Sequence, residues 1–324
     1  MVVPVLIIGV WSVSYLALSL LWAFGGPGYP FDAGRAGAGN TLLDPVPAAV
    51  GGGVLAVSAL VAAGVAVLAA RGPLNRAPAV IAVVAGVGLA VVLPDVRIMM
   101  TAGYLPVMLA AVLAGQAEFS MIASMLTWPS VNLLILMAAG VSLMVLGTRA
   151  FLGGNRRPFS AAGALRIGWY ATAVAVAVPV VYAVTRFGWF LGVPVGISDE
   201  FLSYIAEITP IGAGLGALGL IGAGLTVGLV RPWGEIWPRW VPFLRGRPIP
   251  ALFPACSALA VSLPITSAGL MYVRKKLSGE QVGPAGAADE LGAWLPEMLW
   301  PLWGAALAVA ALAYLSRRRH LAHG

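Results

Sequence analysis

Four acidic residues have the types and positions that best fit a binding site. Asp32 and Asp199 each close a Gly- and Pro-rich turn after an apolar stretch, and Glu118 and Glu290 each precede a Trp-Pro pair by ten positions. Paired carboxylates at an outer membrane face would concentrate a cation or a cationic ligand. The alternative is structural, because acids also cap short helices and close Gly/Pro turns. The sequence leaves both interpretations open.

Few other residues offer chemistry. Cys256 is the only cysteine, and its apolar neighbours predict a buried, inert thiol. The two histidines, His320 and His323, both lie in the C-terminal tail. No Walker A, zinc-protease or nucleophile-elbow pattern occurs. We therefore predict no catalytic residue, no metal site and no cofactor, and an enzyme is the least favoured class of function.

The composition is that of an integral membrane protein. Of 324 residues, 60% are hydrophobic and 10% charged, and the mean hydropathy is +0.94. Continuous apolar runs predict spanning helices rather than a barrel. We assign the net charge of +7 to a membrane surface and not to nucleic acid. Seventeen of the nineteen basic residues are Arg, a composition typical of GC-rich bacteria, so we expect a bacterial cytoplasmic membrane.

Eight spans are predicted with both termini in the cytoplasm. This orientation places thirteen of nineteen basic residues inside, and Glu235 is then the only inner acid. The cluster Arg274 to Lys276 violates the rule. Segment 98–115 is apolar but short, and we expect it to be re-entrant or interfacial on the outer side. The spans are 2–24, 47–70, 78–93, 128–148, 168–190, 209–230, 250–273 and 297–315.

The two halves of the chain repeat one pattern. Residues 15–32 and 182–199 both read Y-x6-W-x2-G-x-P-x4-D, and LAVVLP at 89–94 returns as LAVSLP at 259–264. The matches keep their order along the chain. We predict an all-α polytopic fold of two parallel four-helix repeats, residues 1–160 and 161–324.

Residues 231–250 form an inner loop, RPWGEIWPRWVPFLRGRPIP, and a basic C-terminal tail follows the last span. Arginine and tryptophan together predict a surface that lies on headgroups and attracts anionic lipid. Docking of a cytoplasmic protein is the alternative, and a homo-oligomer is left open. The residues of this predicted surface are Arg231, Trp233, Trp237, Arg239, Trp240, Arg245 and Arg247.

The W-x2-G-x-P turn, the arginine-bounded inner turns and the loop 231–250 together resemble uncharacterised multi-pass membrane proteins of actinobacteria. Some of those proteins are single four-helix units of unknown function. The resemblance implies the four-helix unit as the building block, and it implies no activity and no site residues.

Two further charge pairs have candidate roles. Asp95 and Arg97 follow Pro94, a proline that would kink its helix and either line a cavity or be repaired by neighbouring helices. Arg186 and Glu297 both fall near the outer ends of their predicted helices. If they meet, each would stabilise the other.

Two functions from different classes follow. The first is a small-solute or lipid transporter or channel, with a site between the repeats near the acidic outer mouth. The second is a non-catalytic scaffold that stabilises a partner subunit, which would present an exposed apolar groove.

Overall fold

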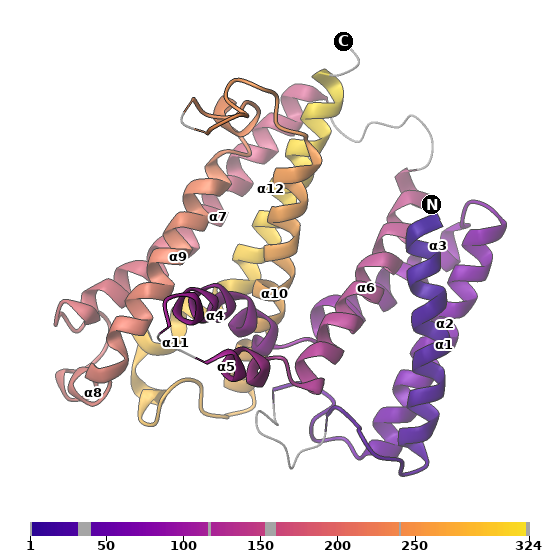
Figure 1. Ribbon diagram of the computed structural model, residues 1–324, viewed down its shortest axis with the longest axis horizontal. Coiled ribbons are helices and arrows are strands. Elements are labelled where there is room, and N and C mark those ends of the chain that lie inside the picture. The colour runs from indigo at the N-terminus through magenta and orange to yellow at the C-terminus, as the bar shows by residue number, and fades with distance from the viewer. Residues whose placement is uncertain (1, 32–39, 116–117, 153–159, 240, 322–324) are drawn as a thin grey trace. The chain divides into compact units, whose positions relative to one another are not determined.

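The computed structural model describes residues 2–31, 40–115, 118–152, 160–239 and 241–321. The chain divides into two compact units, Met1–Arg156 and Arg157–Gly324. Within the described ranges, all regular elements are helices, and β pairing is limited to the isolated bridge between Ile236 and Pro248. Figure 1 shows the helices of both units, each of which is described by itself below.

Unit 1 is built on two helix pairs. The first two long helices pack on each other, the third packs on the last, and the first also contacts the last. Tyr15 on the first helix donates a hydrogen bond to Asn132 Oδ1 on the last, at 2.6 Å. The helices are α1 (Val2–Ala23), α2 (Ala48–Arg71), α3 (Arg76–Val87), α4 (Val96–Leu113), α5 (Phe119–Met125) and α6 (Trp128–Leu152).

Small residues permit the close helix contacts of unit 1. A Cβ added to Gly52 on α2 would lie 2.7 Å from the Ser19 carbonyl oxygen on α1. Gly86 on α3 and Gly140 on α6 are equally tight, since a Cβ on either would lie 2.6 Å from the other's carbonyl oxygen. Membrane helices gain their packing contacts where small residues let the backbones approach.

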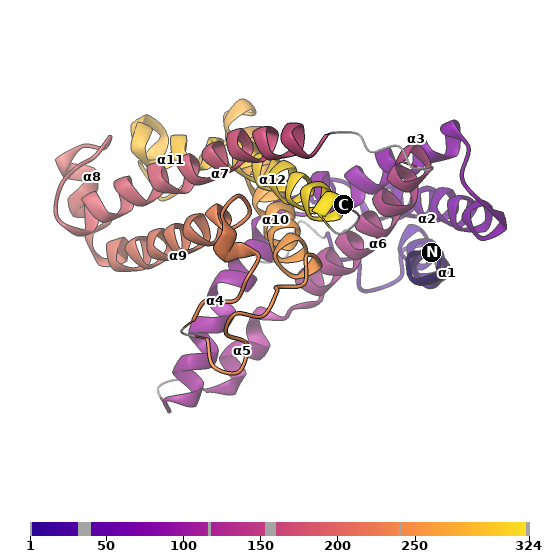
Figure 2. The same ribbon diagram turned by 90° about the horizontal axis from the view of Figure 1, so that it is seen from above.

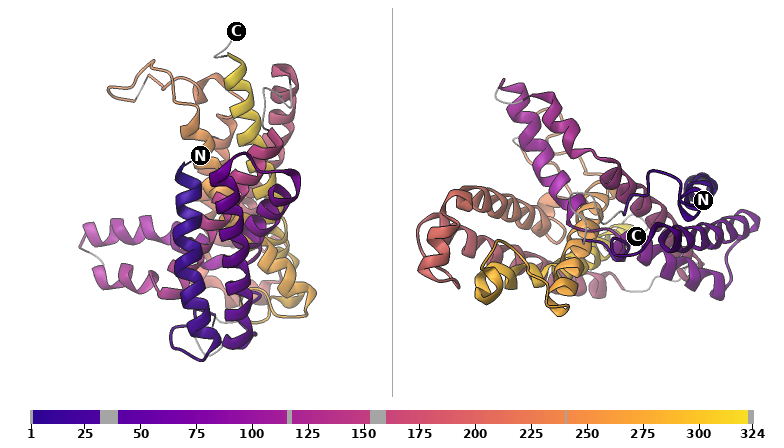
Figure 3. Two further views of the ribbon diagram at one scale, coloured as in Figure 1. Left: turned by 90° about the vertical axis from the view of Figure 1, so that its right-hand side faces the viewer. Right: turned by 90° about the horizontal axis from the view of Figure 1, so that it is seen from below.

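The third span of unit 1 is broken. After α3 the chain makes a π-helical turn, Gly88–Val92, and the direction changes by 58° before α4 begins. Pro94 cannot continue the hydrogen-bond ladder. Figures 2 and 3 show that α4 and α5 run across the long helices of this unit rather than along them. The sequence predicted a span at 78–93 and a separate re-entrant or interfacial segment at 98–115, and the bent pair is compatible with a broken span or a re-entrant loop.

Unit 2 contains the two longest of the described helices, with 30 and 26 residues. The first packs on both the second long helix and the last, and the third packs on the last. Pro264 lies inside the third helix, which continues past it without a break. The helices are α7 (Ala161–Phe190), α8 (Asp199–Tyr204), α9 (Thr209–Val227), α10 (Leu252–Leu277), α11 (Leu291–Met298) and α12 (Trp300–Leu321).

The helices confirm a membrane-spanning class. Seven of those described are long and apolar enough to cross a bilayer, and the bent pair of α3 and α4 makes eight if it counts as one span. These are the helices of a multi-pass membrane protein. The predicted burial of Cys256 is wrong, because its side chain is exposed on α10. Apolar neighbours in sequence do not distinguish a helix face in the core from one that faces lipid.

Candidate functional site

The four predicted acids have different surroundings. Asp32 lies outside the described residues. Asp199 is exposed in the first turn of α8, where a carboxylate interacts favourably with the helix dipole. Glu118 is exposed at the N-cap position of α5 and accepts a hydrogen bond from the Ser120 hydroxyl at 3.0 Å. Both acids therefore lie at helix starts, but Ser198 rather than Asp199 caps α8, and the Glu118 side chain makes no capping hydrogen bond.

Glu290 holds two segments of unit 2 together. One carboxylate oxygen accepts the backbone N–H of Ser198 at 2.8 Å, and the other accepts the Ser198 hydroxyl. Beside this contact the backbone N–H of Gly292 donates to the Gly196 carbonyl at 2.7 Å. Glu290 therefore joins the start of α11 to the turn that precedes α8. Its oxygens are engaged by the protein's own donors rather than held open for a ligand.

The loop 231–250 contains a short hairpin, which the described residues 235–239 and 241–249 form. The backbone N–H of Trp237 donates to the Arg247 carbonyl at 2.9 Å, and that of Ile249 donates to Glu235 at 2.8 Å. Gly246, with a φ of 73°, allows the chain to turn back, and its N–H donates to the Trp237 carbonyl at 3.1 Å. These backbone bonds give the hairpin a defined shape.

The C-terminal end of α12 fixes this hairpin in place. Tyr314 donates its hydroxyl hydrogen to the Gly234 carbonyl at 3.0 Å, and the carboxylate of Glu235 pairs with Arg317. Arg318 lies 3.9 Å from the second Glu235 oxygen and donates to the Ile249 carbonyl at 3.1 Å. In Figure 1 the hairpin and the end of α12 lie at one end of unit 2, and α8 and α11 lie at the other. The basic tail of the sequence thus neutralises the one acid of the loop.

A cavity of about 640 Å³ lies beneath the hairpin, between α9, α10 and α12. Its volume falls in the range of about 300–1,000 Å³ that is usual for small-molecule sites. Thr226 and Ser257 also line it, but the hydroxyl of each donates to a carbonyl of its own helix, at 2.8 Å. The lining is therefore almost wholly apolar. Its residues include Gly222, Leu225, Gly228, Leu229, Trp233, Trp237, Val241, Ile249, Phe253, Ala258, Val261, Trp303 and Leu307.

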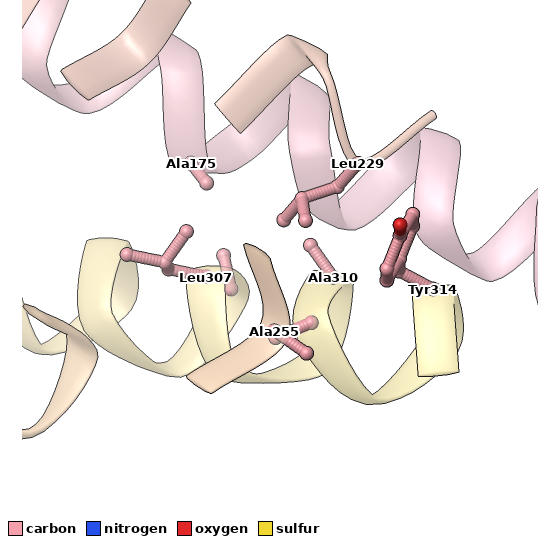
Figure 4. Close-up of a cluster of buried hydrophobic side chains, with 8 residues drawn as sticks. Ala175, Leu229, Ala255, Leu307, Ala310 and Tyr314 are labelled. Carbon is pink, nitrogen blue, oxygen red and sulfur yellow. The ribbon is translucent and has the colours of Figure 1, made fainter. Parts of the chain in front are cut away.

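The cavity arises from the way the helices pair. Since α9 packs on α7 and α10 packs on α12, the space between α9 and α10 is left to the hairpin. Figure 4 shows the buried cluster behind it, in which Leu307, Ala310 and Tyr314 of α12 lie near Ala175 of α7 and Leu229. Leu229 and Leu307 belong to both the cluster and the lining. The packed core of unit 2 thus supplies part of the wall of the cavity.

The predicted arginine and tryptophan surface is divided between two roles. Trp233 and Trp237 line the cavity, and Trp237 also packs on Phe253 with ring centroids 5.9 Å apart. The guanidinium of Arg231 lies 4.8 Å from the ring centroid of Trp169. Arg239, Arg245 and Arg247 are exposed, and Trp240 lies outside the described residues. The sequence analysis did not predict the cavity. The available signal was the alternation of tryptophan with glycine and proline in residues 231–250.

Two charge pairs lie away from this cavity. In unit 2, Arg186 donates to Glu297, and both residues are buried. In unit 1, Asp95 is fully buried and accepts from Arg97 Nη2 at 2.6 Å, while Asp44 lies 3.9 Å from the same nitrogen. Arg186 and Glu297 therefore do contact each other, which was the condition for their predicted mutual stabilisation.

Among the described residues, no group of three or more His, Cys, Asp or Glu lies close enough to hold a metal ion. No family model, curated protein or solved structure matches this chain. The site is therefore interpreted from its own geometry.

Proposed function

We propose that this protein binds a lipid of the bacterial cytoplasmic membrane in the cavity of unit 2 and transports it. The cavity beneath the inner hairpin is the observation that carries the proposal. Helices α9, α10 and α12 belong to candidate spans, and a helix that crosses a bilayer is surrounded by lipid. An apolar space of this size, walled by membrane helices, fits an acyl chain better than a polar solute.

The architecture that we propose for this function is a tandem pair of parallel four-helix repeats with both termini in the cytoplasm. Helix pairing supports it, because both units have the same pairs of long helices. In each unit the first packs on the second, the third packs on the last, and the first also contacts the last. The turn after the first helix supports it further. Gly25 and Gly192 have φ angles of 82° and 79°, and each donates its N–H to a tryptophan carbonyl at 3.0 Å.

The next residue of each turn makes the matching bond. Gly26 donates to the Leu21 carbonyl and Val193 donates to the Gly188 carbonyl, both at 2.8 Å. Together the two bonds form the Schellman motif that commonly ends helices. Equivalent residues thus end α1 and α7 in the same way.

A passage between the repeats, with Asp32 and Asp199 at an acidic mouth, stays a prediction, as does the resemblance to actinobacterial proteins. We place the site in unit 2 because the cavity there is described in full. Glu290 is less favoured as a ligand-binding residue, since Ser198 already occupies both of its oxygens.

Filling the cavity tests the proposal. Gly222 lines it, and a Cβ added there would meet no atom within 4 Å. Gly222→Leu should therefore occupy ligand space without forcing the backbone apart. Gly214→Leu is the matched control, because Gly214 lies on the same helix, is equally open and does not line the cavity.

We expect Gly222→Leu to reduce the lipid that stays with the detergent-purified protein, measured by quantitative mass spectrometry, and to slow transfer of a fluorescent lipid in proteoliposomes. Gly214→Leu should match the unaltered protein in both. Equal lipid retention by the two variants would overturn the proposed site. Retained lipid that moves no faster than in protein-free vesicles would replace transport by the partner-stabilising alternative.

A further inference from the structure

We propose that the ligand of this cavity is an anionic phospholipid, with one acyl chain in the cavity and its phosphate bound by Arg239 and Arg247 of the hairpin. This inference rests on the proposed function and adds the chemical class of the lipid. It also assigns a headgroup site to residues that do not line the cavity themselves.

Apolar and basic residues alternate along the hairpin. Pro238 and Val241 line the cavity, and Arg239 lies between them in sequence. Ile249 lines it as well, and Arg247 precedes it by two positions. On both arms of the hairpin, an exposed arginine therefore lies within two residues of one that lines the cavity.

Backbone pairing brings these two arginine positions to the same part of the hairpin. The Arg247 carbonyl accepts the N–H of Trp237, which is two positions before Arg239. Trp237 itself lines the cavity. A lipid whose chain contacts the Trp237 ring would thus have its polar end near both arginines. Guanidinium groups bind phosphate oxygens through paired N–H donors, and this fork geometry favours arginine for the task.

The hairpin keeps a positive charge, because its acid is paired with arginines from outside the hairpin. Glu235 is the only acid between 231 and 250, and Arg317 and Arg318 of α12 pair with it. The backbone carbonyls of Leu229 and Ile249 accept from the same two tail arginines. The tail therefore neutralises the acid that would otherwise compete for Arg239 and Arg247. An anionic ligand meets exposed arginines that the loop's own acid does not offset.

The tip of the hairpin favours a membrane lipid over an acidic peptide. Phe243 is 94% exposed at the tip, and Leu244 beside it is also exposed. Aromatic and basic residues together are typical of segments that lie at the headgroup level of a bilayer. An acidic peptide would leave both this apolar tip and the apolar cavity without a partner. A phospholipid satisfies the tip, the cavity and the arginines together.

Lipid titration of the purified full-length protein tests this inference. Phosphatidylglycerol and phosphatidylcholine with identical acyl chains are compared by native mass spectrometry, because they differ in net charge and share their apolar part. We expect tighter binding of phosphatidylglycerol. Arg239→Gln and Arg247→Gln should each weaken it about fivefold, and phosphatidylcholine binding should fall less, because its choline cation offsets the charge of the phosphate that the two lipids share.

The control pair is Arg71→Gln and Arg149→Gln, which removes exposed arginines from the last turns of α2 and α6, two helices that carry no residue of the hairpin. It should leave the preference for phosphatidylglycerol intact. Equal binding of the two lipids by the unaltered protein would overturn this inference, as would an equal loss from the control pair. Inorganic phosphate without lipid should not compete, and full competition would assign the arginines to free phosphate instead.

The same titration separates this inference from the proposed function. If Gly222→Leu weakens the binding of both lipids while the hairpin substitutions do not change it, the cavity binds lipid and the proposed arginine site is wrong. If Gly222→Leu weakens neither lipid, the proposed function fails with it.

Discussion

The carboxylate of Glu297 pairs with the guanidinium of Arg186, although 111 residues separate them in the sequence. Both are buried, and the guanidinium also lies 4.2 Å from the ring centroid of Trp189 and 4.5 Å from that of Tyr182. Arg186 Nη1 donates to the Gly292 carbonyl at 3.3 Å. The pair joins α7 to α11, which forms the start of the last candidate span of unit 2. Opposite charges in an apolar setting are tolerated because each replaces part of the other's hydration.

Removing one partner of this pair should be costly. Glu297→Gln keeps the side-chain size and leaves the Arg186 charge buried without its carboxylate, so we expect a loss of about 3 kcal/mol or more in the free energy of unfolding. Denaturation in detergent, followed by tryptophan fluorescence, would measure it. The double variant Arg186→Met with Glu297→Met should recover much of the loss, since no unpaired charge remains. Unchanged stability in Glu297→Gln would show that the pair contributes nothing.

Asp95 offers a second test, in unit 1. Its carboxylate accepts Arg97 Nε at 2.8 Å and Nη2 at 2.6 Å, and the side chain is fully buried beside the break between α3 and α4. Asp95→Asn should destabilise the protein by about 2–3 kcal/mol, because the Arg97 guanidinium then loses its nearest carboxylate, while that of Asp44 lies 3.9 Å away.

The control for this substitution is Asp199→Asn, an exposed aspartate whose change should stay within about 0.5 kcal/mol. Limited proteolysis of the α4 segment in both variants would locate the effect. Similar cleavage rates and equal stabilities would mean that the buried pair does not hold the bend.

Neighbouring glycines on α2 test the close packing of unit 1. A Cβ at Gly52 would meet backbone atoms of Ser19 and Ala23 at 2.7 and 2.8 Å, whereas one at Gly53 would meet nothing within 4 Å. Gly52→Ala should therefore cost about 1–3 kcal/mol, since α1 must move away. Gly53→Ala should be neutral or slightly stabilising, because alanine favours the helix. Thermal unfolding midpoints of the two variants in one detergent would decide the matter, and equal midpoints would contradict close contact between α1 and α2.

The turn glycines give a conformational test. Gly192 has a φ of 79°, and a Cβ there would meet no atom within 4 Å, so Gly192→Ala adds backbone strain without a clash. We expect a loss of about 1 kcal/mol. Gly214→Ala, which is equally open but helical, should gain about 0.5 kcal/mol instead. A loss of similar size in both variants would point to packing rather than to the left-handed backbone.

Tyr29 predicts a stability loss at high pH. It is buried in the connection between α1 and α2, and burial, with a smaller contribution from the nearby Asp44 carboxylate, raises its pKa to about 12. An unfolded tyrosine has a pKa near 10. The folded state therefore holds the phenol proton more tightly, and this stabilisation, complete below pH 10, is lost as the pH rises through about 12. Stability of the unaltered protein and of Tyr29→Phe between pH 8 and pH 12 would measure it, and parallel curves would contradict the shift.

The features that sequence reasoning recovered are local in origin. Apolar runs of spanning length indicated the long helices, since hydropathy follows directly from composition along one segment. The glycines of the two W-x2-G-x-P turns adopt the left-handed conformation that a helix end favours. The bend near Pro94 followed from the missing N–H of proline. The prediction that Cys256 is buried was wrong, because a lipid-facing helix surface has the same composition as a core-facing one.

The sequence by itself determined the helical membrane class, the approximate positions of the spans and the turns that end them, because each depends on residues close together in the chain. Tertiary structure alone decided that Arg186 meets Glu297, that Ser198 engages Glu290, and that a cavity opens beneath the hairpin. These depend on which helices pair, and pairing is set by side-chain volumes and close backbone contacts far apart in sequence. The cavity exists because α9 packs on α7 and α10 packs on α12. This pairing cannot be predicted from any one segment of the sequence.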